Sequence, residues 1–180
     1  VVHKELGTAT LPGKQLAKWH YTQHEASIDE MTNISKANRE KLGDNYTSGC
    51  MQHIDEQYAK HGTIKYLFPT EEGKFVENVY ISEDERVTLG VSSQVGCKMN
   101  CLFCQTGKQG FEGNLSAADI LNQIYSLPER DKLTNIVFMG QGEPMDNLDN
   151  VLRATQVMTT DYGYAWSPKR ITVSSIGIKG

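Results

Sequence analysis

The sequence lacks several features that would place it in a specialised class of protein. Within its 180 residues no apolar run approaches the length of a membrane span, and the longest obvious one is Ile136 to Met139. The first residues, VVHKELG, lack the charged, apolar and small-residue regions of a signal peptide. Neither a solenoid-type repeat nor a low-complexity tract is present. These absences favour an ordinary globular protein without a membrane anchor.

An excess of basic residues is also absent. Lys and Arg total 18, and Asp and Glu total 22, so the formal net charge is −4. Nucleic-acid-binding proteins usually carry a basic surface, so charge alone does not indicate an RNA or DNA partner. Hydrophobic residues make up 38% and charged residues 22% of the chain, which is typical of a soluble domain.

Cysteine is scarce, with four residues, yet three of them lie within eight positions. Cys97, Cys101 and Cys104 have the spacing C-x-x-x-C-x-x-C in the segment GCKMNCLFCQTGKQGF. Such crowding favours metal ligation in a reducing compartment over a secreted disulfide framework, so we expect a cytoplasmic protein. Cys50 stands apart from the group and is expected to be an ordinary free cysteine.

Three changes of pattern along the chain predict an α/β fold. Residues 1–48 show helical spacing, and residues 49–87 alternate with a period of two, which predicts a small antiparallel sheet. Residues 88–180 read as strand, helix, strand, helix, strand, which predicts parallel βαβ units, the first strand ending just before Cys97. Since three parallel strands are a poor place for such a sheet to finish, we expect the chain to be a fragment.

The cysteine group is open to three interpretations. The first is three unligated cysteines, and the second is a zinc site, for which the nearest histidines, His53 and His61, fall on the predicted antiparallel sheet. The third is a cubane iron–sulfur cluster, whose soft iron atoms take thiolates from one short loop. The third fits the spacing best. With only three protein ligands, one iron stays open to a small molecule such as S-adenosylmethionine, which can bind through its amino and carboxylate groups.

A second motif, FMGQGEPMDN, directly follows the predicted strand TNIVF. The bland interpretation is a tight strand-to-helix turn. The turn nevertheless carries Glu143, which can accept hydrogen bonds from an ammonium group, and Gly140 and Gly142 allow close approach of the backbone to a ligand. Ser174 and Ser175 end the next predicted strand, and their spacing fits plain strand-end hydroxyls as well as ligand contacts.

An acidic residue interrupts an apolar face in the segment GKFVENVYI. Alternation places Phe75, Glu77, Val79 and Ile81 on one side of the predicted strand. A carboxylate among apolar side chains would be partly desolvated, which suits a general base. The alternative, in which Glu77 lies at a sheet edge and reaches water, is the one that periodicity alone favours.

The cysteine spacing with Phe103 before the last cysteine resembles the radical S-adenosylmethionine superfamily, and GQGEP resembles its GGEP turn, which holds the amino group of the methionine moiety. Together, VSSQVGCKMNCLFCQTGKQGF, NIVFMGQGEPMDN and KRITVSSIG resemble the RlmN/Cfr family, radical enzymes that methylate an adenine carbon in RNA. The segment LPGKQLAKWHYTQHEASIDEMTNISKANREKL is similar to that family's helical accessory domain. TGKQGF and GEPMDN are closer to the RlmN branch, which acts on carbon 2 of adenine in 23S rRNA and some tRNAs, whereas the Cfr branch acts on carbon 8.

The resemblance implies a fold, cofactors and roles for individual residues. The fold is a helical accessory domain (1–48), a small antiparallel sheet (49–87) and the first three βα units (88–180) of a partial (β/α)6 barrel. The cofactors are a 4Fe–4S cluster and S-adenosylmethionine, and the partners are 23S rRNA, tRNA and an electron donor such as flavodoxin or ferredoxin. The residues implied are the cluster ligands Cys97, Cys101 and Cys104, the S-adenosylmethionine contacts Gly142, Glu143 and Ser174, and the proton acceptor Glu77.

The family also uses a methyl-carrying cysteine near its carboxyl end, and no cysteine follows Cys104 here. We therefore expect an N-terminal fragment that does not methylate RNA alone and that self-associates through the open edge of its last strand. Two other classes stay open. A different radical enzyme would share the cysteines and the glycine turn but not the helical segment, and a structural zinc module would share only the cysteines.

Overall fold

The computed structural model describes residues 11–22, 27–32, 34–46 and 49–178. The chain divides into two compact units, which are described separately. The helical unit comprises residues 1–50 and 157–166, and the sheet unit comprises residues 51–156 and 167–180. Within the described ranges, every helix is too short or too polar to cross a membrane.

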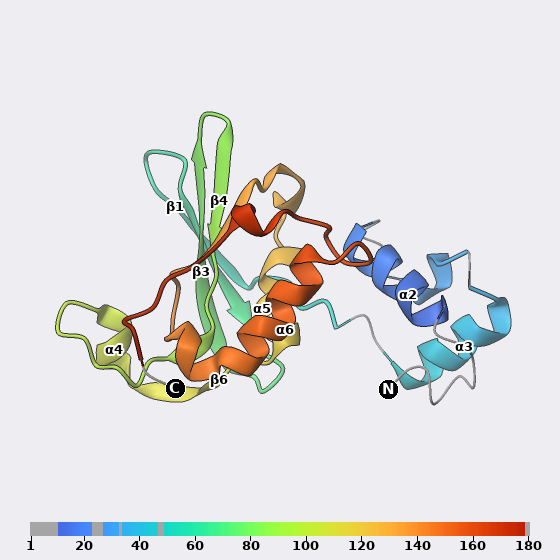
Figure 1. The fold of residues 1–180 in the computed structure, drawn as a ribbon, viewed down its shortest axis with the longest axis horizontal. Coiled ribbons are helices and arrows are strands. Elements are labelled where there is room, and N and C mark those ends of the chain that lie inside the picture. Colours follow the sequence, from blue (N-terminus) through green and yellow to red (C-terminus); the bar gives the residue numbers. More distant parts are fainter. Residues whose placement is uncertain (1–10, 23–26, 33, 47–48, 179–180) are drawn as a thin grey trace. The chain divides into compact units, whose positions relative to one another are not determined.

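Among the described residues up to 46, the helical unit has two α-helices and one 3-10 helix. α2 (Leu11–Thr22) is followed by η1 (Ile28–Glu30) and α3 (Lys36–Asn45) (Figure 1). Ser27 caps η1, because its hydroxyl accepts a hydrogen bond of 3.3 Å from the backbone N–H of Asp29. The described residues of this unit include four buried large apolar side chains: Met31, Ile34, Leu42 and Met158.

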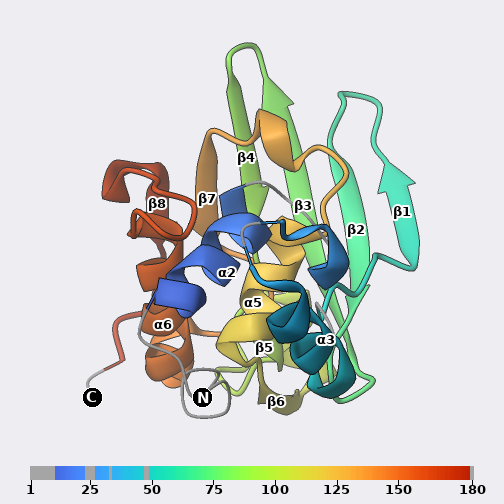
Figure 2. The same cartoon turned by 90° about the vertical axis from the view of Figure 1, so that its right-hand side faces the viewer.

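The sheet unit is built on one six-stranded sheet in the order β1-β2-β3-β4-β7-β8 (Figure 2). β1 to β4 pair in antiparallel fashion, whereas β4, β7 and β8 pair in parallel, so the two halves share β4. Gly62 and Gly73 form the first two hairpin turns with φ of +80° and +75°, a backbone region that favours glycine. The strands are β1 (Asp55–Tyr58), β2 (Ile64–Pro69), β3 (Phe75–Glu83), β4 (Arg86–Gly90), β7 (Asn135–Phe138) and β8 (Ile171–Val173).

Two crossover helices connect the parallel strands and lie along the same face of the sheet (Figures 1 and 2). α5 (Ala117–Tyr125) lies between β4 and β7 in the chain, and α6 (Leu148–Thr159) lies between β7 and β8. A capping box formed by Ser116 and Asp119 begins α5. The core between sheet and helices includes these fully buried side chains: Tyr66, Phe68, Leu89, Ile120, Ile124, Ile136 and Phe138. The α/β prediction with parallel βαβ units is confirmed.

A two-stranded ribbon at the carboxyl ends of β4 and β7 differs from the prediction. β4 ends at Gly90, and the three residues before Cys97 form β5 (Gln94–Gly96), which pairs with β6 (Phe111–Asn114) instead of continuing the main sheet. The expectation of a single strand running to Cys97 is therefore wrong. Gly96 has φ of +73°, and a Cβ there would lie 1.9 Å from the carbonyl oxygen of Gly110, so the ribbon turns where only glycine fits.

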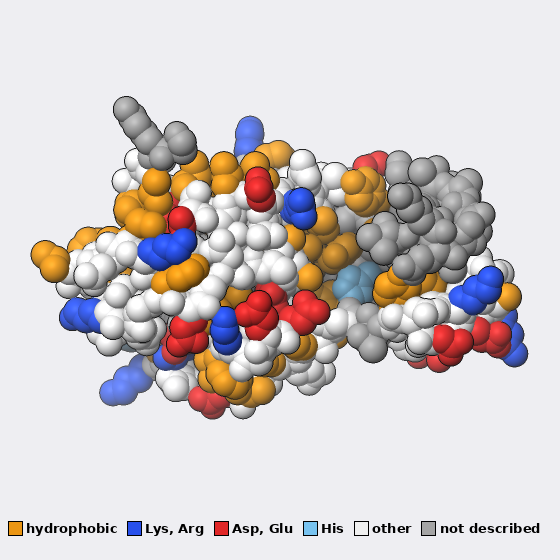
Figure 3. Space-filling model, turned by 90° about the horizontal axis from the view of Figure 1, so that it is seen from below, with side chains coloured by type: hydrophobic (Ala, Val, Ile, Leu, Met, Phe, Trp, Pro, Cys, Tyr) orange, Lys and Arg blue, Asp and Glu red, His pale blue; other side chains and the backbone are white. Residues whose placement is uncertain are grey.

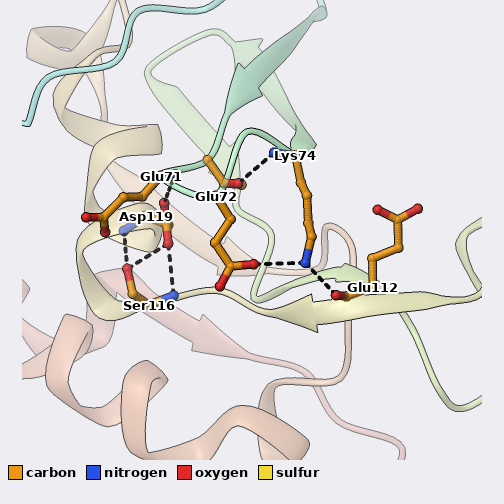
Figure 4. Close-up of polar contacts among 7 residues, drawn as sticks. Glu71, Glu72, Lys74, Glu112, Ser116 and Asp119 are labelled. Carbon is orange, nitrogen blue, oxygen red and sulfur yellow. Dashed lines mark hydrogen bonds and ion pairs between the residues drawn. The ribbon is translucent and has the colours of Figure 1, made fainter.

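The hairpin between β2 and β3 is fastened to the ribbon and to α5 (Figure 4). Lys74 Nζ lies 2.8 Å from Glu72 Oε2 and donates a hydrogen bond of 2.7 Å to the backbone oxygen of Glu112 on β6. The backbone N–H of Glu71 donates to Asp119 Oδ1 at 3.0 Å. The hairpin, β6 and the start of α5 therefore form one connected wall of the sheet unit.

Candidate cofactor site

The three clustered cysteines lie on a loop that leaves β5 and returns through the short helix α4 (Gln105–Gln109) to β6. The backbone N–H of Cys97 donates to the oxygen of Gly110 at 2.8 Å, which closes the base of the loop. Cys104 is the N-cap residue of α4, and its N–H donates to the oxygen of Cys101 at 3.0 Å. All three thiols are free and half-buried. The loop thus presents three soft ligands from eight residues.

The tip of this cysteine loop, residues 97–104, is apolar and exposed. Leu102 is 92% and Phe103 is 93% exposed, the highest values among the large hydrophobic side chains described. Asn100 has φ of +46°, and a Cβ on Gly107 would lie 3.1 Å from the Cα of Asn100, so the loop turns sharply against α4. The cysteine loop therefore projects its apolar tip away from the core.

The donor set can be compared with the two metal groups considered. Among the described residues, no three His, Cys, Asp or Glu side chains are grouped so as to hold one metal ion. A tetrahedral zinc ion needs four ligands that converge on one point. His53 is engaged elsewhere, with Nε2 lying 3.5 Å from Glu56 Oε2. A cubane cluster instead binds each thiolate at a different iron, so its ligands stand farther apart. Three thiols on a glycine-flanked loop fit that group.

The glycine turn, residues 140–147, follows β7 and packs against the segment that follows β4. Ser92, in the segment after β4, joins the turn to β3. Its hydroxyl accepts a hydrogen bond from Gln141 N at 2.8 Å and donates one to the backbone oxygen of Glu77 at 2.5 Å. A Cβ on Gly140 would lie 2.6 Å from Ser92 Oγ, and a Cβ on Gly142 would lie 2.6 Å from the Cβ of Gln94. Both glycines therefore have a packing role, and contact between Gly142 and a cofactor stays a prediction.

Glu143 is buried, with 4% exposure, and caps the 3-10 helix η3 (Pro144–Asn147). Its Oε1 accepts from Met145 N and its Oε2 accepts from Ile176 N, both at 3.1 Å. Each carboxylate oxygen can accept two hydrogen bonds, so both retain capacity for a further donor. Ile176 lies just after β8, and the half-buried Ser174 precedes it by two residues. The structure therefore brings the end of the third parallel strand to Glu143.

Glu77 lies on β3, between β2 and β4, and its side chain is 43% exposed. Its Oε1 lies 2.9 Å from Lys65 Nζ on β2. It lines an open cleft of about 520 Å³ whose walls include Gly96 beside the cysteine loop and Gln141 of the glycine turn. The cleft brings Glu77 into the neighbourhood of both motifs.

The expectation for the faces of β3 was wrong. The face of β3 that carries Glu77 is half-exposed, and the opposite face, with Val76, Asn78 and Tyr80, is the buried one. The sheet-edge alternative is partly confirmed: β4 pairs with β3 only from Val79 to Glu83, so Glu77 has a strand partner on the β2 side alone. Its side chain is 43% exposed and borders the cleft.

Several polar residues that the sequence analysis missed connect the two motifs. Gln94 is fully buried, and its Nε2 donates to Asn114 Oδ1 at 2.7 Å and to Asp146 Oδ2 at 2.8 Å. Its Oε1 accepts from Glu143 N at 2.9 Å. Lys98, between two of the cysteines, lies with Nζ 2.8 Å from the same Asp146 oxygen. The hydrogen bond from Lys98, followed by that from Gln94, lowers the pKa of Asp146 below its ordinary value.

Asn147 completes this set of contacts. Its side chain is buried and donates hydrogen bonds of 2.8 Å to the backbone oxygens of Ser93 and Leu115. Both Gln94 and Asn147 stand inside the motifs SSQVGC and GEPMDN, which is the only signal that could have indicated them. Their bonds run between segments about fifty residues apart, which periodicity does not report.

Two family models match the chain. Residues 91–180 match the model of the Radical SAM superfamily, and residues 3–47 match the Ribosomal RNA large subunit methyltransferase N-terminal domain. The chain belongs to the radical SAM superfamily. Its resemblance to the RlmN/Cfr family is confirmed, and the family implies the predicted cofactors, a 4Fe–4S cluster and S-adenosylmethionine. The roles of the individual site residues stay predictions.

Curated relatives agree with the superfamily assignment. A probable dual-specificity RNA methyltransferase RlmN from Bacteroides thetaiotaomicron is 58% identical over 176 residues, which cover 98% of this chain and 51% of the relative. A dual-specificity RNA methyltransferase RlmN from Halorhodospira halophila is 43% identical over 177 residues, which cover 96% of this chain and 49% of the relative. The chain spans about half the length of these radical SAM relatives.

A solved structure shows the same fold. The radical SAM methyltransferase from Sphaerobacter thermophilus superimposes with a TM-score of 0.87 at 33% sequence identity. The match covers 98% of this chain and 53% of that one. At this level of similarity the parallel strands β4, β7 and β8, with their crossover helices, form the first part of a radical SAM barrel, as the sequence predicted.

Proposed function

We propose that this chain is the cofactor-binding part of a radical SAM methyltransferase that methylates carbon 2 of an adenine in 23S rRNA and in tRNA. Cys97, Cys101 and Cys104 hold a 4Fe–4S cluster whose remaining iron is open to S-adenosylmethionine. The carrying observation is that the cysteine loop and the glycine turn, far apart in the sequence, meet at the carboxyl ends of β4 and β7. α/β barrels place their chemistry at this end of the strands.

Glu143 is proposed to bind the ammonium group of the methionine moiety. Its buried carboxylate is held in place by two backbone N–H groups and retains capacity for a charged donor. Gly142 and Ser174 are proposed as further contacts, because one adjoins Glu143 in the turn and the other lies two residues before Ile176. A cluster held by the three cysteines would supply the electron for reductive cleavage of the sulfonium group of S-adenosylmethionine.

Glu77 is proposed as the acceptor of the proton that leaves the adenine ring. It lines the cleft beside both motifs, and Lys65 Nζ, 2.9 Å from its Oε1, holds the carboxylate in place. Because Glu77 is partly exposed, an adenine ring can approach it through the cleft.

The proposed RNA substrate draws support from the printed names of the relatives, which are dual-specificity RNA methyltransferases. Charge gives no further support, since basic and acidic side chains are interspersed on the face drawn in Figure 3. A cytoplasmic location and an electron donor such as flavodoxin or ferredoxin are proposed with it, in keeping with three clustered cysteines that form no disulfide. Self-association through β8, which pairs with β7 alone among the described strands, stays a prediction.

Metal analysis of the 180-residue chain after anaerobic reconstitution tests this proposal. We expect about four iron and four sulfide per chain, as in a single cubane cluster. One zinc ion per chain, without iron or sulfide, would overturn the proposal in favour of a structural zinc module. The chain by itself is expected to bind both cofactors without methylating RNA, and nucleoside analysis of RNA incubated with it under reducing conditions checks that second expectation.

A further inference from the structure

Lys98 occupies one of the three positions between Cys97 and Cys101, yet its side chain reaches out of the loop. Its Nζ lies 2.8 Å from Asp146 Oδ2 in the glycine turn and 4.3 Å from the ring centroid of Phe111 on β6. Of the side chains in the cysteine loop, Lys98 is the one for which the described structure shows a bond to the turn. The two cofactor motifs are therefore connected directly through a residue that is not itself a ligand.

The carboxylate of Asp146 is oriented by contacts other than the one with Lys98. The buried amide of Gln94 donates to the same Oδ2 at 2.8 Å, and its own orientation is fixed by Asn114 and by the N–H of Glu143. Ion pairs at partly exposed sites usually contribute little, because two long side chains must be ordered to form them. Here the carboxylate is already ordered, and the Phe111 ring restricts the lysine.

We propose that Lys98 and Asp146, seated on Gln94, act as a clamp that holds the cysteine loop at a fixed position relative to Glu143. Both are positioning residues that act through the loop, and no contact with the cluster or its ligand is assigned to them. The inference rests on the proposed function for what the loop carries, whereas the clamp itself is a property of the protein alone. A fixed loop sets where the cluster stands relative to the ammonium-binding carboxylate, and small errors in such positions strongly reduce reaction rates.

Hydrogen exchange of the cluster-free chain tests the clamp directly. In Lys98→Met and Asp146→Asn, amides of residues 97–110 should exchange about two- to fivefold faster, while those of β3 and β7 stay protected and report an intact fold. The double variant should exchange no faster than either single variant, because both remove the same contact. Asn at position 146 keeps an acceptor for Gln94, so the turn itself is spared.

The matched control is Lys108→Met, which removes an exposed lysine on α4 for which the described structure gives no ion pair. Its exchange should equal that of the unchanged chain, and Lys98→Arg should restore slow exchange. Additive effects in the double variant, or equal effects from Lys108→Met, would overturn the clamp.

A spectroscopic measurement separates this inference from the proposed function. After reconstitution, S-adenosylmethionine is titrated while the EPR spectrum is recorded. The concentration at half-maximal spectral change should rise about threefold in Lys98→Met and Asp146→Asn, and in Lys98→Arg it should equal that of the unchanged chain. An unchanged half-point in both variants would contradict the clamp. A chain that binds no iron would refute the proposed function, and the exchange experiment would then decide the clamp alone.

Discussion

The cysteine loop and the glycine turn meet at one end of the sheet, yet they are built in opposite ways. In the turn, Glu143 and Asn147 are each 4% exposed, and their side chains make two and three hydrogen bonds respectively. In the loop, Leu102 and Phe103 are more than 90% exposed, and the backbone bonds lie at its base and at the start of α4. The protein fixes the turn by itself, whereas the loop depends on its thiols and on Lys98.

This difference predicts how substitutions in each segment affect the protein. A segment anchored by buried hydrogen bonds opens together with the surrounding fold, whereas an exposed loop with few contacts opens locally. Substitutions that remove side chains from the loop should therefore change cofactor binding without changing global stability. Substitutions in the turn should change both cofactor binding and global stability.

Removing a thiol from the cysteine loop should have the largest effect. Replacement of Cys97, Cys101 or Cys104 by Ala should abolish the brown chromophore after anaerobic reconstitution, because each thiolate binds a different iron of the cluster. Thermal unfolding of the cluster-free variants should stay close to that of the unchanged chain, since all three side chains are only half-buried. Cys50→Ala is the control and should keep full absorbance. Full absorbance in all three variants would show that the loop does not hold the cluster.

An intermediate effect is expected in the turn from Glu143→Ala. Loss of a charge-assisted acceptor removes about 1.5–3 kcal/mol of binding free energy, so affinity for S-adenosylmethionine should fall about ten- to a hundredfold in calorimetry. Glu77→Gln is the matched control, because it removes a carboxylate of the cleft outside the turn and should leave this affinity unchanged. Swapped effects would reverse the two role assignments.

The smallest effect concerns the packing of the turn. In Gly140→Ala the new Cβ would lie 2.6 Å from Ser92 Oγ and 2.8 Å from Ser92 N, and relief of this overlap should destabilise the chain by about 1–3 kcal/mol in urea unfolding. Gly90→Ala is the control, since its nearest neighbour, the oxygen of Val79, stands at an ordinary 3.6 Å. Equal stability of the two variants would mean that the turn is not closely packed.

Much of this arrangement could be predicted because its signals are local. Ser116 and Asp119 stand three residues apart and form the capping box that begins α5. The apolar strand before Gly140 is a parallel strand whose Ile136 and Phe138 are buried, as expected for a strand with one face covered by a crossover helix. Chemistry also helped, because clustered thiols and a carboxylate after a strand are uncommon enough to stand out.

The remaining features depend on contacts between distant segments. Gln94 and Asp146 are 52 residues apart, and a buried amide has no periodic signature. β5 spans three residues, too few for alternation to be recognised. The face of β3 was assigned wrongly because both of its faces carry apolar residues, Phe75 and Val79 on one and Val76 and Tyr80 on the other. Only the crossover helices decide which face is covered.

The two bonds of the Ser92 hydroxyl have a mechanical consequence. One joins it to the backbone of Glu77 and the other to the backbone of Gln141, so a single oxygen atom bridges the strand of the proposed base and the turn that carries Glu143. The backbone spacing between the proposed proton acceptor, Glu77, and the turn that carries Glu143 is thus set when the chain folds, before any ligand binds. The scaffold therefore sets this spacing, and a substitution at Ser92 would change it while leaving Glu77 and Glu143 in place.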